Sequence, residues 1–240
     1  MSDFRYTRPS SFPPVIKNLI IINALVWVAQ LFFDQQYDLS GKLGLWPIGS
    51  EHFKPYEIAT HMFAHATYIP GGGIMFWHIL FNMLMLWMFG RILENVWGGK
   101  RFLFFYLACG VGSAIAHMTV QYFEFRPVAE AIEQAKQLGN MDLARAIDDR
   151  YAGYAIGASG AVMGVMVAFA FLFPNTELLL FFAIPVKAKW AILGYVALDL
   201  FGGINPGQGD NVAHFAHLGG AITGFIIVWI WNKSNRRTLY

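Results

Sequence analysis

The sequence predicts an all-α, polytopic membrane protein. Of its 240 residues, 56% are hydrophobic and only 13% are charged, whereas a soluble domain carries about 25% charged residues. The apolar residues also gather in long runs, as the interior of a bilayer requires. The net charge of +2 is too small and too dispersed for a nucleic-acid-binding surface, so we expect the lipid bilayer, and not nucleic acid, as a partner.

Six apolar runs approach the length of about 17–25 residues that a transmembrane helix needs. They cover about residues 15–33, 77–94, 102–123, 157–173, 188–203 and 212–231. The chain then divides into an N-terminal segment (1–14), a six-span membrane domain (15–231) and a C-terminal tail (232–240). Residues 1–14 contain no signal-peptide pattern, so the first run is expected to stay in the protein as an anchor. The single cysteine, Cys109, excludes a disulfide framework within the chain.

Two connections between these runs stand out. Residues 177–190 (ELLLFFAIPVKAKW) are apolar but contain Pro185, which disfavours a helix just before it. We therefore expect a buried or interfacial connection there and not a seventh span. Residues 124–150 are polar and predict one or two short amphipathic helices broken at Gly139-Asn140, as a surface insertion.

The distribution of basic residues predicts the orientation. With six spans, both termini and the loops near 91–101 and 174–189 lie on one side. That side holds Arg5, Arg8, Lys17, Arg91, Lys100, Arg101, Lys187, Lys189, Lys233, Arg236 and Arg237, and the other side holds 6 of the 17 basic residues. The positive-inside rule then places both termini in the cytoplasm.

Ser159 is the first polar group of interest, at the start of the fourth run. A serine in a membrane helix usually bonds to a carbonyl of its own helix or packs against a neighbour. Here it stands in the expected first turn, where backbone N–H groups lack partners and the helix dipole favours negative charge. Gly157 and Gly160 leave space beside it for a carbonyl group to approach.

His217, in the sixth run, is the natural base for Ser159. It is expected about two turns into its helix, level with the start of the fourth span. Small residues line one face of both the fourth and the sixth run. They are Gly160 and Gly164 in the fourth run and Ala213, Ala216, Gly220 and Gly224 in the sixth run. Such faces let two backbones approach closely. The approach would bring the imidazole within reach of the serine hydroxyl, which is how a histidine activates a nucleophile.

His78 and Asn82 add hydrogen-bond donors at the start of the second run. Residues four apart share one face of a helix, so their side chains lie next to each other. Donors of this kind stabilise the oxyanion of acyl transfer, each by about 2.7–4 kcal/mol. Without Ser159 and His217, the pair would be interpreted as polar contacts between helices.

These residues fall in three segments that resemble the signature segments of rhomboid proteases. The segments are HILFN (78–82), GASG (157–160) and AHLGG (216–220), and the resemblance covers roughly residues 55–231. It implies a six-helix bundle with a membrane-embedded first loop, in which Ser159 and His217 form a catalytic dyad. It further implies an oxyanion hole of His78, Asn82 and the Ser159 N–H, and no cofactor or metal ion.

The resemblance also implies substrates and a route to the site. The substrates would be single-span or polytopic membrane proteins cleaved within a transmembrane segment, and the membrane is expected to be the bacterial cytoplasmic one. Phe81, the apolar face of the fifth span and the glycine-rich loop 202–211 would form the gate and cap. Residues expected at the gate or packed around the dyad are Phe81, Met163, Gly157, Gly160 and Gly220.

Three alternatives remain at this point. Asp199, in the fifth span, is a possible third catalytic residue, but we favour a contact with loop 202–211. A metal site is a further possibility, because zinc accepts histidine and the chain offers His61, His65, His78, His214 and His217. A catalytically inactive rhomboid-like protein that binds membrane clients is the third.

Overall fold

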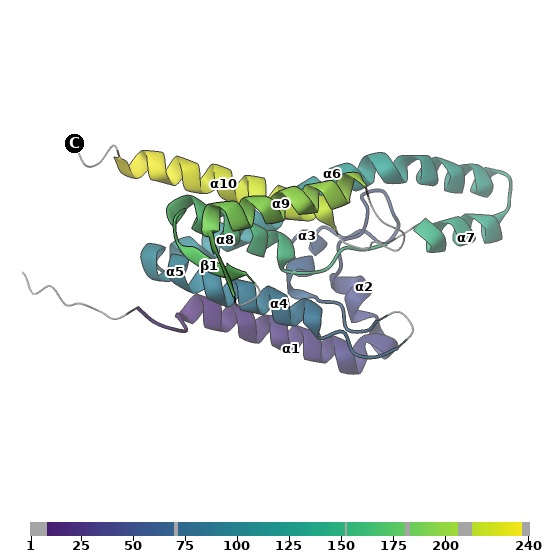
Figure 1. Cartoon of the computed structure of the whole chain (residues 1–240). Coiled ribbons are helices and arrows are strands. Elements are labelled where there is room, and N and C mark those ends of the chain that lie inside the picture. The colour runs from purple at the N-terminus through teal and green to yellow at the C-terminus, as the bar shows by residue number, and fades with distance from the viewer. Residues whose placement is uncertain (1–8, 70–71, 152, 181–182, 206–212, 237–240) are drawn as a thin grey trace, which may run out of the picture.

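The computed structural model describes residues 9–69, 72–151, 153–180, 183–205 and 213–236. Helices dominate this part of the chain (Figure 1). In chain order the elements are α1 (Pro14–Tyr37), α2 (Leu39–Leu43), α3 (Glu57–Thr60), η1 (His61–Phe63), α4 (Trp77–Met85), η2 (Leu86–Gly90), α5 (Arg91–Trp97), α6 (Gly99–Gln137), α7 (Met141–Tyr151), α8 (Ser159–Leu172), β1 (Glu177–Leu180), β2 (Ile184–Lys187), α9 (Ala188–Ile204) and α10 (His214–Arg236).

Four stretches of the described residues are long and apolar enough to cross a membrane. They are Pro14–Tyr37, Trp77–Trp97, Gly99–Glu124 and His214–Ser234. Large apolar side chains cover their outer faces, as at Phe32, which is 76% exposed, and lipid would cover such groups. The chain is therefore a mostly helical, multi-pass membrane protein. The fourth and fifth predicted spans form α8 and α9, of 14 and 17 residues.

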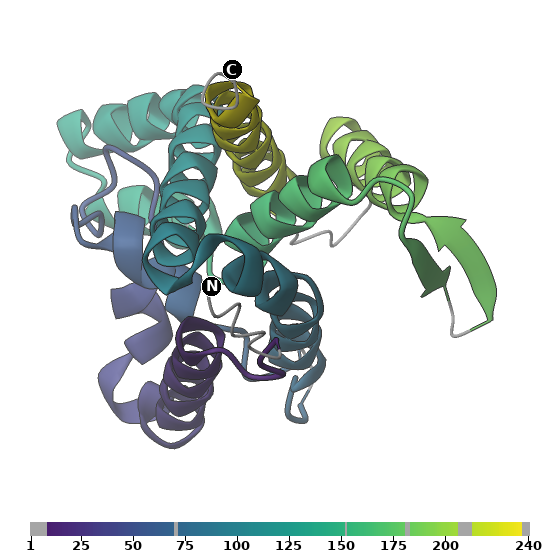
Figure 2. The ribbon, with the colours of Figure 1, turned by 90° about the vertical axis from the view of Figure 1, so that its left-hand side faces the viewer.

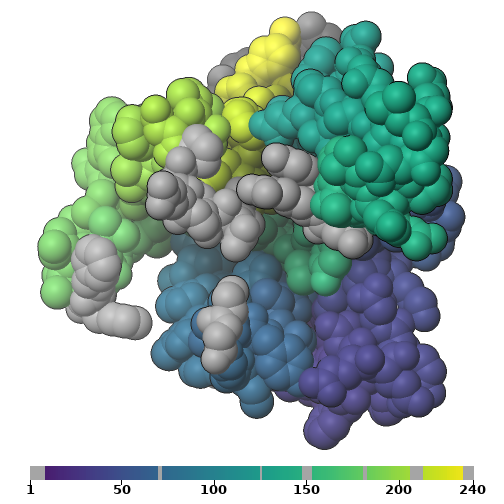
Figure 3. Space-filling model, turned by 90° about the vertical axis from the view of Figure 1, so that its right-hand side faces the viewer, coloured from purple at the N-terminus to yellow at the C-terminus, as the bar shows by residue number. Residues whose placement is uncertain are grey.

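The connection between α8 and α9 corrects the all-α prediction. Strands β1 and β2 pair antiparallel, with Leu179 opposite Pro185. Proline donates no hydrogen bond and is tolerated at the edge of a sheet, so a two-stranded hairpin accommodates it. The hairpin is not buried, since Leu179 and Ile184 are both largely exposed. In Figures 2 and 3 it projects away from the helical body.

The polar segment 124–150 forms a helical hairpin. The predicted break at Gly139-Asn140 is confirmed: Gly139 has a φ of 73°, and the Asn140 side chain accepts the N–H of Leu143 at the start of α7. The first amphipathic stretch is not a separate helix, because α6 continues from the membrane span through Pro127 to Gln137. Figure 1 shows α7 folding back beside this extension.

Helix α8 lies at the centre of the packing and is buried along most of its length. It packs against α6 and α10, as Figure 2 shows. The predicted contact of small residues is confirmed. A Cβ atom added to Gly220 would overlap the carbonyl of Gly160, and one added to Gly224 would lie 2.7 Å from the Cα of Gly164. The two backbones therefore touch at these positions.

Glu94 ties the second span to the start of α1. Its Oε1 accepts the N–H of Val15 at 2.9 Å and its Oε2 accepts the N–H of Ile16 at 2.8 Å. The carboxylate is 3% exposed and satisfies two N–H groups that have no partner within their own helix. The residue is thus a structural one.

We expect Glu94→Gln to lower stability without affecting chemistry. The amide keeps one acceptor atom but loses the charge and the second acceptor, at a cost of about 1–2 kcal/mol. Thermal unfolding in detergent should show a melting temperature lower by about 2–8 °C. A melting temperature equal to that of the wild type would contradict this role.

Candidate active site

Ser159 is the first residue of α8, as the sequence predicts, and it is partly exposed. Gly157, two residues earlier, is buried and has a φ of 135°, a conformation that side chains other than glycine rarely adopt. Further upstream, the backbone N–H and carbonyl groups of Ala155 both bond with those of Leu45. Leu45 belongs to the first loop, which is the connection between α1 and α4. The serine thus lies at the end of a segment that the first loop holds in place.

The first loop also binds the backbone directly before the serine. Gly157 donates its N–H to the carbonyl of His61 at 2.9 Å, and Ala158 donates its N–H to His65 Nε2 at 3.3 Å. Burial, together with neighbouring His78, lowers the pKa of His65 to about 3, which keeps its ring neutral and able to accept. Among the described residues, the Ser159 N–H has no acceptor, so it is available to a ligand.

The side chains of Ser159 and His217 meet. The distance between Ser159 Oγ and His217 Nε2 is 2.7 Å. His217 is the fourth residue of α10, so it lies in the first turn and not two turns into the helix as expected. The other ring nitrogen, Nδ1, lies 3.0 and 3.1 Å from the two carboxylate oxygens of Asp199.

The contact with Asp199 decides how this pair is protonated. A carboxylate only accepts hydrogen bonds, so His217 Nδ1 carries the proton and donates it. Nε2 of the neutral ring is then the free acceptor, and the Ser159 hydroxyl donates to it. This is the arrangement in which histidine can take the serine proton.

Asp199 contacts α10, and its expected contact with the loop 202–211 stays a prediction. The side chain is buried and faces α10, where it also accepts a bond from His214 Nδ1 at 2.8 Å. Residues 206–211 of that loop lie outside the described part of the chain. The sequence signal for the contact between Asp199 and His217 was an acidic residue in an apolar span, 18 residues before a histidine. Only the packing of α9 on α10 brings the two together.

His78 lies on the other side of the serine. Its Nδ1 accepts the N–H of Ala66 at 3.2 Å, which leaves the proton on Nε2. A Cβ atom added to Gly157 would be 3.0 Å from His78 Nε2 and 3.5 Å from Ser159 Oγ. The missing side chain of Gly157 therefore leaves a space between the serine hydroxyl and a hydrogen-bond donor.

Asn82 lies in the same helix as His78, but its side chain has a weaker connection to Ser159 than His78 has. Its Nδ2 donates to the carbonyl of His78, one turn earlier in α4, at 2.8 Å, and the residue is buried. No hydrogen bond joins Asn82 to Ser159 or His217 among the described residues. The amide still has a second N–H to donate, since an NH₂ group carries two protons.

A family comparison fits this geometry. The rhomboid domain model matches residues 52–234, more than half of the chain. The chain belongs to the rhomboid family. The matched region of this rhomboid contains Ser159, His217, His78 and Asn82, and also Asp199.

Several curated rhomboids are similar to the chain. Rhomboid protein 1, mitochondrial, of Saccharomyces cerevisiae is 33% identical over 161 residues, which cover 66% of this chain and 39% of that protein. RHOMBOID-like protein 12, mitochondrial, of Arabidopsis thaliana is 29% identical over 222 residues, covering 92% and 59%. Rhomboid protease AarA of Providencia stuartii is 26% identical over 230 residues, covering 87% and 69%. The chain thus spans less than two thirds of the length of each of the two mitochondrial relatives.

The residues expected at the gate or packed around Ser159 and His217 lie in different places. Phe81 is 53% exposed and stacks on Trp77 with ring centroids 5.8 Å apart, so it lies on the outer surface. Met163 is 2% exposed and belongs to the interior of α8. Gly160 and Gly220 form the α8–α10 contact already described, and Gly157 lines the space beside the serine.

The histidines considered for a metal site have other partners in the rhomboid. His61 Nδ1 bonds with the carbonyl of Glu57 at 2.9 Å, and His65 accepts the N–H of Ala158. His214 and His217 both bond with Asp199. Within the described ranges, no group of three or more metal-binding side chains is arranged to hold an ion.

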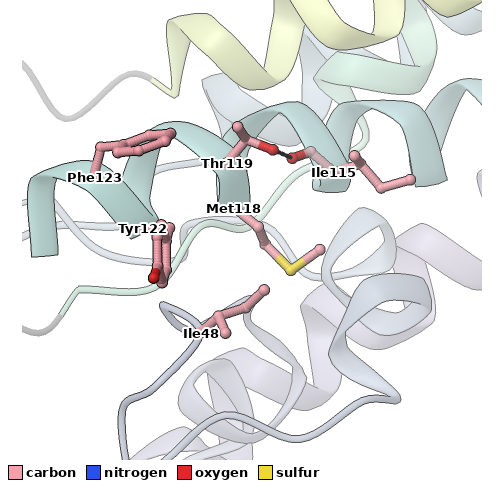
Figure 4. Close-up of a pocket in the computed structure, with 6 residues that line it drawn as sticks. All are labelled: Ile48, Ile115, Met118, Thr119, Tyr122 and Phe123. Atoms are coloured by element: carbon pink, nitrogen blue, oxygen red, sulfur yellow. Dashed lines mark hydrogen bonds between the residues drawn. The ribbon is translucent and has the colours of Figure 1, made fainter. Parts of the chain in front are cut away.

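An apolar hollow of about 300 Å³ lies elsewhere on the rhomboid. Ile48 of the first loop and residues of α6 line it (Figure 4), and they are Ile115, Met118, Thr119, Tyr122 and Phe123. Ser159 and His217 do not belong to this lining. The hollow is therefore separate from the candidate active site.

Proposed function

We propose that this rhomboid is an intramembrane serine endopeptidase, with Ser159 as nucleophile and His217 as general base. The observation that carries the proposal is the 2.7 Å contact between Ser159 Oγ and His217 Nε2. This distance lies within the range of about 2.6–3.2 Å that a base needs to take a proton from its nucleophile. The chemistry requires no cofactor.

The reaction would proceed by acyl transfer. Ser159 Oγ attacks the carbonyl carbon of the scissile bond while its proton moves to His217 Nε2. The tetrahedral intermediate collapses, and the C–N bond breaks as Nε2 gives the proton to the leaving amine. Water then attacks the acyl-enzyme, with its proton passing to His217. Release of the new carboxyl group returns that proton to Ser159 Oγ.

The oxyanion of each intermediate would occupy the space beside Gly157. Three donors border this part of the site in the proposal: the Ser159 N–H, His78 Nε2 and the remaining N–H of Asn82. Two observations support the first two donors. The Ser159 N–H has no acceptor in the described part of the chain, and a Cβ atom added to Gly157 would lie 3.0 Å from His78 Nε2. Backbone donors at a helix start are already oriented toward developing negative charge.

The length of α8 supports a reaction below the membrane surface. Its 14 residues extend over about 21 Å, whereas the hydrocarbon core is about 30 Å thick. A helix this short starts inside the bilayer if its other end reaches the surface. Ser159 would then meet a substrate at the depth of its transmembrane segment, and that segment must unwind to expose its backbone.

The membrane arrangement is part of the same proposal. We count α8 and α9 as short fourth and fifth spans, which gives six spans with both termini in the cytoplasm by the charge distribution. A membrane-protein substrate would enter past Phe81 and the apolar face of α9, where Leu198 is 72% exposed. The bacterial cytoplasmic membrane is the proposed location.

The test is cleavage of a model single-span substrate in proteoliposomes. Wild type should cleave it, whereas Ser159→Ala and His217→Ala should lose at least about 10⁴-fold in kcat/KM, because neither partner acts alone. A fluorophosphonate should label wild-type Ser159 by displacement of fluoride from phosphorus. The same reagent should leave both variants unlabelled.

Two results would overturn the proposal. Undiminished cleavage by Ser159→Ala would show that another group attacks the substrate. A wild type that neither cleaves nor reacts with the fluorophosphonate, yet binds transmembrane segments, would be a catalytically inactive client-binding rhomboid.

A further inference from the structure

Asp199 is the one acidic side chain that contacts the candidate dyad among the described residues. It accepts hydrogen bonds from His217 Nδ1 at 3.0 Å and from His214 Nδ1 at 2.8 Å. The residue is 9% exposed and lies in the second half of α9. Burying a carboxylate in an apolar span is costly, so such a residue usually has a functional partner.

We propose that Asp199 is a positioning residue for the reaction. Its carboxylate holds the Nδ1–H tautomer of His217 and fixes the ring so that Nε2 faces Ser159. The inference rests on the proposed protease function and extends its set of residues from two to three. Each residue comes from a different helix: Asp199 from α9, His217 from α10 and Ser159 from α8.

The second partner of the carboxylate strengthens this assignment. His214 lies one turn before His217 on α10 and binds the same oxygen, Oδ1. A carboxylate anchored in this way stays in place when the His217 ring turns or gains a proton. It can therefore both restore the ring orientation and stabilise the imidazolium that forms during proton transfer.

A purely structural role makes different predictions. In α9, the buried residues are Ala188, Ile192 and Asp199, so Asp199 also helps to hold α9 against α10. Loss of that contact alone would lower stability and disturb substrate entry, which appears in KM. Loss of a positioning residue lowers kcat and the reactivity of Ser159 toward a small reagent, since Asp199 does not touch the substrate.

The experiment compares Asp199→Asn and Asp199→Ala with Glu94→Gln in proteoliposomes. Glu94 is a matched control, because it is also a buried carboxylate that joins two helices, but without contact to the dyad. We expect the fluorophosphonate labelling rate and kcat to fall about 10²–10⁴-fold in both Asp199→Asn and Asp199→Ala. The Asn amide can donate to Nδ1 instead of accepting from it, which favours the tautomer that cannot take the serine proton. KM should stay within about twofold.

The Glu94→Gln control should lose stability but label at close to the wild-type rate. If Asp199→Ala does not fold, the isosteric Asp199→Asn decides. Labelling of Asp199→Asn within about twofold of wild type would overturn the positioning role. So would a large rise in KM with kcat unchanged, since this is the result expected for a purely structural contact.

A spectroscopic readout separates this proposal from the protease proposal. In protein labelled with ¹⁵N-histidine, the Nδ1 proton of His217 should give a far-downfield signal because it bonds to a carboxylate. Variants His217→Gln and His214→Gln assign the two signals expected at Asp199. Loss or a large upfield shift of the His217 signal in Asp199→Asn supports the proposal, and its persistence overturns it. A wild type that shows the signal but neither labels nor cleaves refutes only the protease function.

Discussion

Gly157→Ala is expected to lower the labelling rate of Ser159 and the kcat for cleavage by about 10²–10³-fold, which is the loss typical of one oxyanion donor. The new Cβ would lie 3.0 Å from His78 Nε2 and 3.5 Å from Ser159 Oγ, in the space proposed for the oxyanion. The φ of 135° adds backbone strain, since alanine rarely adopts it. The filled space acts on the reaction, whereas the strain lowers the stability of the folded state by about 1–3 kcal/mol.

Gly153→Ala is the matched control for Gly157→Ala. It changes glycine to alanine in the same connection before α8, but the added Cβ would meet nothing within 4 Å. Its labelling rate should equal that of wild type. The measurement is the second-order rate of fluorophosphonate labelling, with thermal unfolding as a check on folding. Equal rates for Gly157→Ala and Gly153→Ala would contradict the proposed place of the oxyanion.

Gly220→Ala is expected to damage both stability and activity. Its Cβ would overlap the Gly160 carbonyl, and because a backbone atom cannot turn aside, α8 and α10 must separate. Overpacking of this kind costs about 1–3 kcal/mol, which lowers the melting temperature by about 2–12 °C. Ser159 and His217 lie on these two helices, and a displacement of about 1 Å costs on the order of 10²-fold in rate.

Gly194→Ala provides the comparison within a helix. Gly194 lies in α9, and a Cβ there would meet nothing within 4 Å. Alanine is the better helix former by about 1 kcal/mol, so stability should be unchanged or slightly higher and labelling unaffected. The α8–α10 contact is tested by measuring thermal unfolding and fluorophosphonate labelling of both Gly220→Ala and Gly194→Ala. A Gly220→Ala protein that melts and labels like wild type would show that the helices are not held at this distance.

Much of the fold follows from the sequence because a bilayer restricts what can cross it. A run of apolar residues must form a helix, since its backbone groups find no water. Four of the predicted spans accordingly appear as long apolar helices. The glycine spacing in the fourth and sixth runs likewise predicted close packing, because only small residues permit backbones to touch.

The sequence pattern predicted the connections between the spans less well than the spans themselves. Residues 177–180 and 184–187 gave no sign of strand alternation, yet they pair as a hairpin with Pro185 opposite Leu179. The α6 helix runs through Pro127, although a proline usually ends or kinks a helix. At Pro127 the surrounding helix outweighs the preference of a single residue, whereas the extended backbone of the hairpin suits Pro185.

The candidate site shows the same division. The residue types that acyl transfer needs, Ser159 at a helix start and His217 in another span, follow from the sequence because helix termini and periodicity are local properties. The sequence does not indicate which other polar side chains contact this part of the chain. The contact of His65 with the Ala158 N–H and that of Asp199 with His217 join residues 93 and 18 positions apart. They depend on how whole helices pack, which no local pattern reveals.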